Sequence, residues 1–257
     1  QSTISTSIAA GDLDGDGDSE IVFGSSSGVL YSLDKTGAEF MSYVQEKPII
    51  DFPVLSDLDQ DGDLEIVFVS TDDTSSTLNA IDHNGEDIDG FPIEISDKII
   101  VGPAVADLDN DMVMDIVVAS LDSNIVYVVN ENGLIAIDGS PLQPFEFTTP
   151  ATLADLDGDQ DLEIILGKSN GDLKILHHDG PPMISSSFDS AIRGGVSIAD
   201  IDANGSFEII FGTEDGYIYA WDPIEDVVAP GWPIQTEQGA ISEPITVDLD
   251  NDGDLEI

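Results

Sequence analysis

Short runs of β-branched apolar residues recur along the chain, each bounded by turn-forming residues. They read IVFGS, IVFVS, IVVAS, IILGK and IIFGT, at 21–25, 66–70, 116–120, 164–168 and 209–213. Ile and Val favour strands, and apolar runs this short are typical of strands that are buried on both faces. We therefore expect a buried strand at each of these places.

A turn and then a segment of alternating apolar and polar residues follow each run. These segments lie at 28–37, 76–85, 124–133, 171–180 and 216–225. A period of two indicates a strand with one buried face, and Asn-Gly at the end of two of the segments is a frequent hairpin turn. Each repeat therefore contains a second predicted strand.

Two further strands complete the repeat. Segments that open with Gly and Pro follow at 90–95, 139–144, 180–185 and 231–236. Pro lacks an N–H donor, so these segments suit the outer edge of a sheet. Segments of small residues, which suit an innermost strand near an axis, lie at 52–59, 102–109, 149–157, 194–202 and 243–250. The first repeat is less regular at 38–47.

Four antiparallel strands that recur every 45 to 50 residues predict an all-β fold, a β-propeller with four-stranded blades. The chain contains five full repeats and the start of a sixth, beginning near residues 5, 50, 99, 147, 192 and 240. We expect residues 1–257 to form a single propeller domain or a fragment of one. A propeller hides its sheet edges by closing a ring, so we expect the remaining strands to come from elsewhere.

An acidic loop of ten residues joins the innermost strand of each repeat to the next strand. The six loops begin at Asp12, Asp57, Asp107, Asp155, Asp200 and Asp248, with the pattern D-x-D-x-D-G-x-x-E/D. Carboxylates this close together repel one another unless a cation lies between them. The first half of the pattern equals the start of an EF-hand loop, but the last acid falls at position 9 rather than 12.

Oxygen ligands in a flexible loop favour Ca²⁺ over Mg²⁺. The chain has no cysteine and its three histidines lie outside the loops, so we expect no ligands for softer metals. We predict up to six Ca²⁺ ions, one in each loop, which hold hairpins together and take no part in chemistry. The side chains at positions 1, 3, 5 and 9 and the backbone carbonyl at position 7 are the expected ligands.

The predicted ligand residues follow loop by loop. The first loop contributes Asp12, Asp14, Asp16, Asp18 and Glu20, and the second contributes Asp57, Asp59, Asp61, Asp63 and Glu65. The third contributes Asp107, Asp109, Asp111, Val113 and Asp115, and the fourth contributes Asp155, Asp157, Asp159, Asp161 and Glu163. The fifth contributes Asp200, Asp202, Asn204, Ser206 and Glu208, and the sixth contributes Asp248, Asp250, Asp252, Asp254 and Glu256.

Position 6 of the loop is expected to adopt the left-handed backbone conformation that glycine tolerates best. The third and fourth loops carry Met112 and Gln160 there, at a cost of about 1 kcal/mol or more. We therefore predict weaker binding in these two loops. The 107–115 loop is expected to bind most weakly, because it also lacks an acid at position 7.

The loops, the EIVFG-type strands that follow them and the period of about 47 residues resemble the FG-GAP/VCBS repeats of integrin-α-like β-propellers. The resemblance covers nearly the whole chain. It implies a calcium-binding propeller, commonly seven-bladed, in secreted or surface-anchored proteins. In that family the calcium hairpins lie on one face and partners often bind the other. A parent ring of six to eight blades, with seven favoured, follows from it, although five of the loops here end in Glu where the family often has Asp.

Composition narrows the class of partner. The chain has 53 acidic and 6 basic residues, a formal net charge of −47, and 41% hydrophobic residues, enough for a sizeable core. Nucleic acid and anionic membrane surfaces are poor partners for such a charge, and no apolar run is long enough to insert into a membrane. We expect a protein or glycan ligand, and an extracellular or cell-surface location where free calcium is millimolar.

These features predict a non-catalytic, calcium-stabilised extracellular propeller that serves adhesion, ligand binding or scaffolding. One alternative is the propeller of a calcium-dependent polysaccharide lyase, which would need a basic residue near bound calcium. The basic residues lie in no recognisable motif: Lys35, Lys47, Lys98, Lys168, Lys174 and Arg193. A second alternative is a structural subunit of a surface layer or filament, with self-association through unclosed sheet edges.

Three weaker signals have ordinary interpretations. The G-x-S-x-G sequence at 24–28 corresponds to turn sequences in other repeats, so we expect a hairpin turn and not a nucleophile elbow. The pair His177 and His178 is expected at the end of a strand, pointing to opposite faces. Trp221 and Trp232 are expected to fill space between blades.

Overall fold

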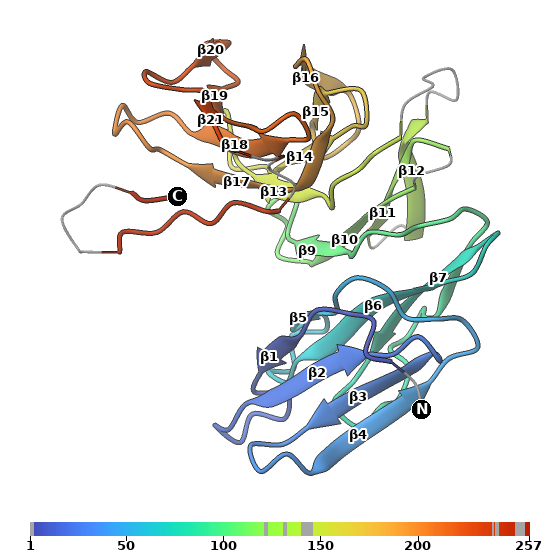
Figure 1. Cartoon of the computed structure of the whole chain (residues 1–257). Helices are drawn as coiled ribbons and strands as arrows, with labels where there is room; N and C mark the ends of the chain where they lie inside the picture. Colours follow the sequence, from blue (N-terminus) through green and yellow to red (C-terminus); the bar gives the residue numbers. More distant parts are fainter. Residues whose placement is uncertain are drawn as a thin grey trace. The chain divides into compact units, whose positions relative to one another are not determined.

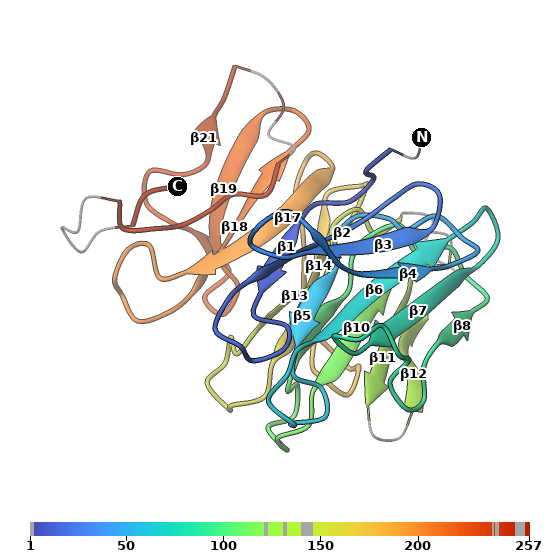
Figure 2. The ribbon, with the colours of Figure 1, turned by 90° about the horizontal axis from the view of Figure 1, so that it is seen from below.

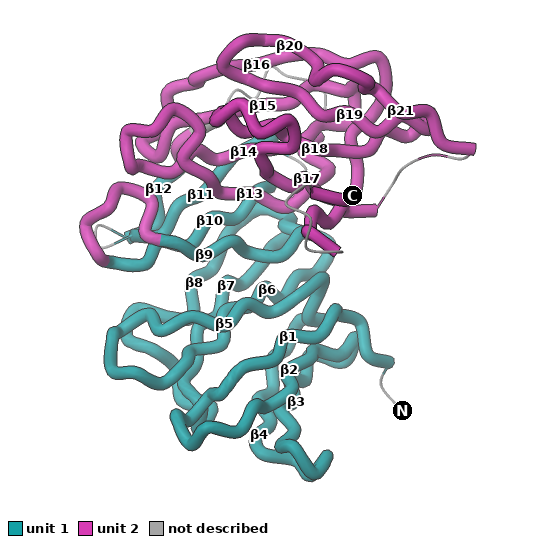
Figure 3. Tube along the Cα trace, turned by 90° about the vertical axis from the view of Figure 1, so that its left-hand side faces the viewer, with its two compact units in different colours: residues 1–106, 113–136 teal, residues 107–112, 137–257 magenta. Residues whose placement is uncertain are grey.

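The computed structural model describes residues 3–120, 123–130, 133–139, 146–237, 239, 242–249 and 255–257. Within these ranges the regular secondary structure is all strand, arranged as four sheets of four strands and one of five (Figure 1). The chain divides into two compact units, residues 1–106 with 113–136, and residues 107–112 with 137–257 (Figure 3). No helix in the described ranges is long and apolar enough to cross a membrane.

The first unit holds two complete sheets and most of a third, each with its strands in chain order. The first sheet contains β1 (Ala9–Gly11), β2 (Glu20–Gly24), β3 (Val29–Leu33) and β4 (Glu39–Val44). The second contains β5 (Val54–Ser56), β6 (Glu65–Thr71), β7 (Ser76–Ile81) and β8 (Ile93–Ile95). The third contains β9 (Ala104–Ala106), β10 (Asp115–Ala119), β11 (Ile125–Asn130) and β12 (Gly133–Gly139).

The second unit contains the fourth and fifth sheets. The fourth is built from β13 (Thr152–Ala154), β14 (Glu163–Gly167), β15 (Asp172–Leu176) and β16 (Pro182–Ser187). The fifth is built from β17 (Ile192–Ala199), β18 (Glu208–Thr213), β19 (Tyr217–Asp222), β20 (Val227–Val228) and β21 (Ile234–Gln235). Figure 2 shows β17, β18 and β19 side by side, with β21 next to β19.

The predicted apolar runs are the second strands of the sheets, and β6 shows why they are apolar throughout. Ile66 and Phe68 pack in the core shared with the first sheet, whereas Val67 and Val69 pack in the core shared with the third. Since the strand is covered on both faces, alternate side chains enter different cores and all seven residues of β6 are buried.

In the second unit the core lies between the fourth and fifth sheets. Its buried side chains are Leu156, Ile165, Leu173, Ile175, Ile192, Val196, Ile209, Phe211 and Trp221. Trp221 is 2% exposed and its ring lies 5.7 Å from that of Phe188, edge to face. Trp232 is half-buried against a smaller cluster on the same sheet. Trp221 thus fills space between two sheets, as the sequence predicts, whereas Trp232 packs against residues of its own repeat.

The outermost strands differ most from the expectation. In the third sheet the outer strand is Gly133–Gly139, earlier than the predicted 139–144, of which 140–144 lie outside the described residues. In the fifth sheet both Val227–Val228 and Ile234–Gln235 pair with β19. Proline-rich edges carry few obligatory ladder bonds, so sequence pattern locates them less well. The irregular 38–47 segment forms β4.

The G-x-S-x-G sequence at 24–28 connects β2 directly to β3. Ser25 is 2% exposed, and its hydroxyl donates to the carbonyl oxygen of Val29 over 2.9 Å. The hydroxyl therefore closes a hairpin turn, and the predicted turn is confirmed.

Candidate metal centres

Each acidic loop leads from a short inner strand into a buried second strand, so its last acid is the first residue of that strand. Glu20, Glu65, Glu163 and Glu208 open β2, β6, β14 and β18. All four are 3% exposed or less. The loop thus places one fully buried carboxyl group beneath several exposed ones.

One oxygen of this glutamate makes the same hydrogen bond in five loops. It accepts from the backbone N–H of the second loop residue: Leu13 to Glu20 (3.0 Å), Leu58 to Glu65 (2.7 Å), Leu156 to Glu163 (2.8 Å), Ile201 to Glu208 (2.9 Å) and Leu249 to Glu256 (2.8 Å). This bond uses Oε2 and leaves Oε1 for another partner. In the sixth loop Asp250, Asp252 and Asp254 lie outside the described residues.

The first aspartate of the loop folds the chain around itself. Both oxygens of Asp12 accept backbone N–H groups, from Asp16 at 3.0 Å and Gly17 at 2.8 Å. Asp107 and Asp200 make the same pair of bonds, to Asp111 with Met112 and to Asn204 with Gly205. Asp155 accepts from Gly158 and Gln160 instead. The backbone donors hold the first carboxylate facing into the loop.

Positions 3 and 5 also turn their oxygens inward, each accepting the N–H group two residues on. In the fourth loop Asp159 donates to Asp157 at 3.2 Å and Asp161 donates to Asp159 at 3.0 Å. Carboxylate oxygens consequently lie within 4.8 Å of one another in sets that include Asp12, Asp14 and Glu20; Asp57, Asp59 and Asp61; and Asp155, Asp157 and Asp159. Three predicted ligands of each of these loops are thus brought together.

The third and fifth loops are less complete. The third is divided between the two units, with Asp107 to Met112 in the second and Val113 in the first, and Asp115 opens β10 at 5% exposed. The fifth has Asn204 at position 5, whose side-chain oxygen accepts from Ser206 at 2.7 Å. Each loop keeps the same local turn even where its charge is lower.

Some buried carboxylate oxygens have no hydrogen-bond partner within the described residues. Asp57 Oδ1 and Glu163 Oε1 are fully buried and have no hydrogen-bond partner. Burial raises the pKa of Glu65, Glu163 and Glu208, and the charges of neighbouring aspartates raise each pKa further, against the opposing backbone hydrogen bond. A buried anion without a partner is costly, and a divalent cation among the oxygens would relieve that cost. These residues therefore fit a metal ion with oxygen ligands.

The backbone at position 6 is left-handed, as the pattern predicts. Its φ is +91° at Gly17, +99° at Gly62 and +95° at Gly205, and the two non-glycine residues Met112 and Gln160 have +75° and +83°. Position 4 is also left-handed, with Gln60 at +62° and Asn110 at +58° among others, which the sequence did not indicate. The loop thus contains two left-handed residues, one on each side of position 5.

Met112→Gly should stabilise the protein by about 0.5–1 kcal/mol, because it removes a side chain from a left-handed residue. Met112 is 75% exposed, so little packing is lost. Urea unfolding of the two proteins measures the difference. Val113→Gly is the matched control, since φ of Val113 is not positive, and it should destabilise. Equal destabilisation by both substitutions would contradict the proposed strain.

Basic side chains lie against the acid at position 7 in three loops. Lys35 Nζ pairs with Asp18, and the Nδ1 atoms of His83 and His178 lie 3.3 Å from carboxylate oxygens of Asp63 and Asp161. All three come from the turn after the third strand of a sheet, β3, β7 or β15, in the aligned sequences DKTG, DHNG and HHDG. An alignment of these turns across the repeats places a basic residue in each and so indicates the contacts with the acid at position 7. The sequence of an acidic loop alone does not indicate them.

His177 is a nitrogen donor that the fold brings to the fourth loop, although it lies outside that loop in the sequence. It stands at the end of β15, as predicted, but its Nδ1 lies 3.4 Å from Oε1 of Glu163. One oxygen of Asp157, one of Glu163 and a ring nitrogen of His177 lie within 4.8 Å of one another. A residue outside the loop in sequence is thus part of the fourth cluster in space.

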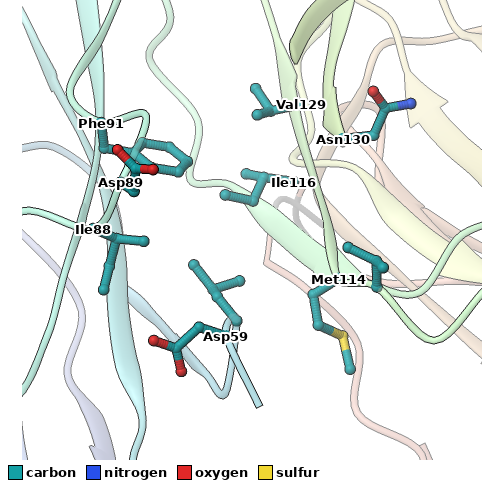
Figure 4. A pocket seen from close by; sticks show the side chains of 10 residues that line it. Asp59, Ile88, Asp89, Phe91, Met114, Ile116, Val129 and Asn130 are labelled. Carbon is teal, nitrogen blue, oxygen red and sulfur yellow. The ribbon is translucent and has the colours of Figure 1, made fainter. Parts of the chain in front are cut away.

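Recesses lie beside the loops in both units. In the first unit Ile88 and Phe91 face Ile116 and Val129 across a pocket of about 290 Å³, with Asp59 of the second loop at its wall (Figure 4). In the second unit a more polar recess of about 370 Å³ lies between the fourth and fifth loops and includes Asp157, Ser206, Phe207 and Ile224. Both recesses place acidic groups next to apolar ones.

Comparisons with known proteins agree with the repeat and the fold. The FG-GAP-like repeat model matches residues 57–118 and 107–166, the repeats that hold the second, third and fourth loops. No curated protein matches the sequence significantly.

The fold resembles solved structures at low sequence identity. BamB from Moraxella catarrhalis has a TM-score of 0.60 at 13% identity, covering 91% of this chain and 65% of BamB. Sqt1 from Saccharomyces cerevisiae has a TM-score of 0.61 at 14% identity, covering 86% of this chain and 60% of Sqt1. BBS1N in complex with ARL6DN has a TM-score of 0.63 at 12% identity, covering 92% of this chain and 70% of BBS1N. This chain thus spans roughly two thirds of each structure's length, and likeness at this identity shows the fold alone, that of a β-propeller. The protein therefore carries FG-GAP-like repeats over residues 57–166 and has a β-propeller fold.

Proposed function

We propose that this protein is a non-catalytic, calcium-stabilised propeller module of an extracellular or cell-surface protein, where it presents its loops to a protein or glycan partner. The observation that carries the proposal is a buried carboxylate oxygen without a hydrogen-bond partner, best seen at Asp57 Oδ1. Oxygen atoms from positions 1, 3, 5 and 9 of a loop are the donor set that calcium prefers.

Charge and calcium supply favour a location outside the cell. A net charge of −47 is sustained best where salt and divalent cations are abundant. Loop sites of the extracellular type bind calcium in the roughly 0.1–1 mM range, so they would fill outside cells and stay empty in the cytosol.

The positions of the basic residues support a non-catalytic role. Lys47 pairs with Glu94 and Arg193 pairs with Glu214. Lys168 is 4% exposed, with Nζ 4.7 Å from the centre of the Phe147 ring. These three side chains are engaged away from the acidic loops, whereas Lys35 pairs with Asp18 at position 7 of the first loop. We expect no turnover of a uronic-acid polysaccharide, followed by absorbance of the unsaturated product; calcium-dependent turnover would overturn this part of the proposal.

Asp59→Ala tests the calcium sites directly. The variant should bind one Ca²⁺ fewer than the wild type and lose about 2–3 kcal/mol of stability at hundredfold calcium excess. Calorimetric titration gives the stoichiometry, and unfolding in calcium gives the stability.

Asp73→Ala is the matched control. It also removes one negative charge, from a side chain that is fully exposed and outside the loops. It should keep the full calcium stoichiometry. Equal stoichiometry in Asp59→Ala and Asp73→Ala would show that the second loop binds no calcium.

A further inference from the structure

The fourth repeat differs from its neighbours at the residue that follows its β15 strand. The corresponding residues are aspartates in three other repeats: Asp34, Asp82 and Asp222. Each accepts backbone N–H groups of its own turn; Asp82 Oδ1, for example, accepts from Asn84 at 2.9 Å and Glu86 at 2.8 Å. In the fourth repeat this residue is His177, and its ring nitrogen faces Glu163 instead.

His177 brings a nitrogen donor to an oxygen cluster. A ring nitrogen of His177, an oxygen of Glu163 and an oxygen of Asp157 lie within 4.8 Å of one another. With bonds of about 2.0–2.2 Å, donors on one tetrahedral zinc ion lie about 3.3–3.6 Å apart. The pair of His177 Nδ1 and Glu163 Oε1 already has this separation, at 3.4 Å, and rotation of the exposed Asp157 side chain would bring in the third donor. The histidine side chain is 34% exposed, which leaves a path for an ion to enter.

A second observation distinguishes this cluster from an ordinary group of surface acids. The Glu163 side chain is 0% exposed, and its Oε1 has no hydrogen-bond partner. The other oxygen is fixed by the N–H of Leu156 at 2.8 Å, so the free oxygen is held in place beside His177. The Nδ1 atom of His177 lies 3.4 Å from this oxygen, beyond the distance of a good hydrogen bond, so a metal ion between them would engage both atoms.

We propose that the fourth repeat is a mixed nitrogen and oxygen site for a first-row transition-metal ion, with Zn²⁺ as the best match, formed by Asp157, Glu163 and His177. Imidazole nitrogen suits zinc, whereas calcium takes six to eight oxygen atoms. The three residues supply one nitrogen and two carboxylates, which leaves a fourth tetrahedral position for water or a partner's side chain. This site differs from the proposed calcium sites of the other loops, because it includes a histidine nitrogen beside the buried glutamate. The described parts of the other repeats place no such nitrogen beside their glutamates.

His178 provides an internal control. It is adjacent in sequence, but its Nδ1 lies near Asp161 and not near Glu163. If any histidine beside an acidic residue sufficed to bind zinc, His178 would contribute to the zinc affinity as much as His177. The matched variants are therefore His177→Asp, which restores the residue type of three other repeats, and His178→Gln.

The metal-stripped full chain is titrated with Zn²⁺ in millimolar calcium at neutral pH, against a chromophoric zinc chelator. We expect one tight zinc per chain in the wild type and in His178→Gln, and at least a tenfold weaker affinity in His177→Asp. In nitrogen NMR spectra of the wild type, zinc should shift the imidazole resonances of His177 more than those of His83 and His178.

The outcomes are separable from those of the calcium proposal. Calcium stoichiometry is measured on the same His177→Asp protein, and circular dichroism confirms its fold. Loss of tight zinc with the other calcium sites intact supports the proposal. Equal zinc affinity in His177→Asp and His178→Gln, or His177 resonances that zinc leaves unchanged, would overturn it whatever the calcium result.

Discussion

Calcium removal will lower the melting temperature of this protein by at least about 10 °C. Each occupied site stabilises the folded chain by about 2.7 kcal/mol at hundredfold calcium excess. The first, second and fifth loops have all their predicted ligand residues described and are assigned to calcium alone, so three sites give on the order of 8 kcal/mol. In a chain of 257 residues each kcal/mol shifts the melting temperature by about 2–4 °C. Thermal unfolding followed by circular dichroism, in calcium and in excess chelator, measures the effect.

The control must separate bound calcium from charge screening. A chain of net charge −47 gains stability from any salt, because counterions reduce its self-repulsion. Sodium chloride at matched ionic strength should therefore recover only a small part of the loss, and magnesium an intermediate part. Full recovery by sodium chloride would mean that screening, and not site binding, stabilises the fold.

Gly28→Ala will destabilise the protein by about 3 kcal/mol or more, even with calcium bound. Gly28 has φ +80°, and a Cβ built there would clash with the carbonyl oxygen of Gln45 and lie 2.7 Å from that of Lys47. Backbone atoms cannot rotate away as side chains do, so the turn between β2 and β3 must shift. The shift disturbs the hydrogen bond from Gln45 N–H to the Gly28 carbonyl, 2.7 Å long. Denaturant unfolding in calcium gives the difference in free energy.

Gly37→Ala isolates the steric part of this effect. Gly37 has nearly the same φ, +79°, but a Cβ there would have no atom within 4 Å. It should cost only the backbone strain, about 1 kcal/mol. The comparison fails if the two variants lose equal stability. Gly171 repeats the crowded arrangement in the fourth sheet, against the carbonyl oxygens of Phe188 and Ser190, so Gly171→Ala should follow Gly28→Ala.

The sequence predicted the parts of the fold that depend on local pattern. The second strands carry apolar side chains at every position, because residues such as Ile66 and Val67 enter different cores, and this pattern is visible without a structure. Position 6 of the loops was predicted to be left-handed from glycine alone, and Met112 and Gln160 adopt that conformation despite their side chains. The regular spacing of the loops gave the number of sheets.

Contacts between hairpins were harder to predict. Nothing in the sequence near His177 indicates Glu163, fourteen residues earlier, until the register of β14 with β15 places them together. The left-handed residue at position 4 was also missed, because the residue type there varies: Gly15, Asn110 and Gly158 favour this conformation, but Gln60 and Ala203 do not. The outer strand Gly133–Gly139 was placed too late, since an edge strand is fixed by few obligatory hydrogen bonds.

Crystals grown in calcium and measured at a wavelength with anomalous calcium signal would test the central claim most directly. We predict an anomalous peak in the first and second loops, about 2.3–2.6 Å from oxygen atoms of Asp12 and Glu20, and of Asp57 and Glu65. The orphaned Asp57 Oδ1 should be one of these ligands. Well-ordered loops without a peak, at saturating calcium, would contradict a calcium-stabilised propeller.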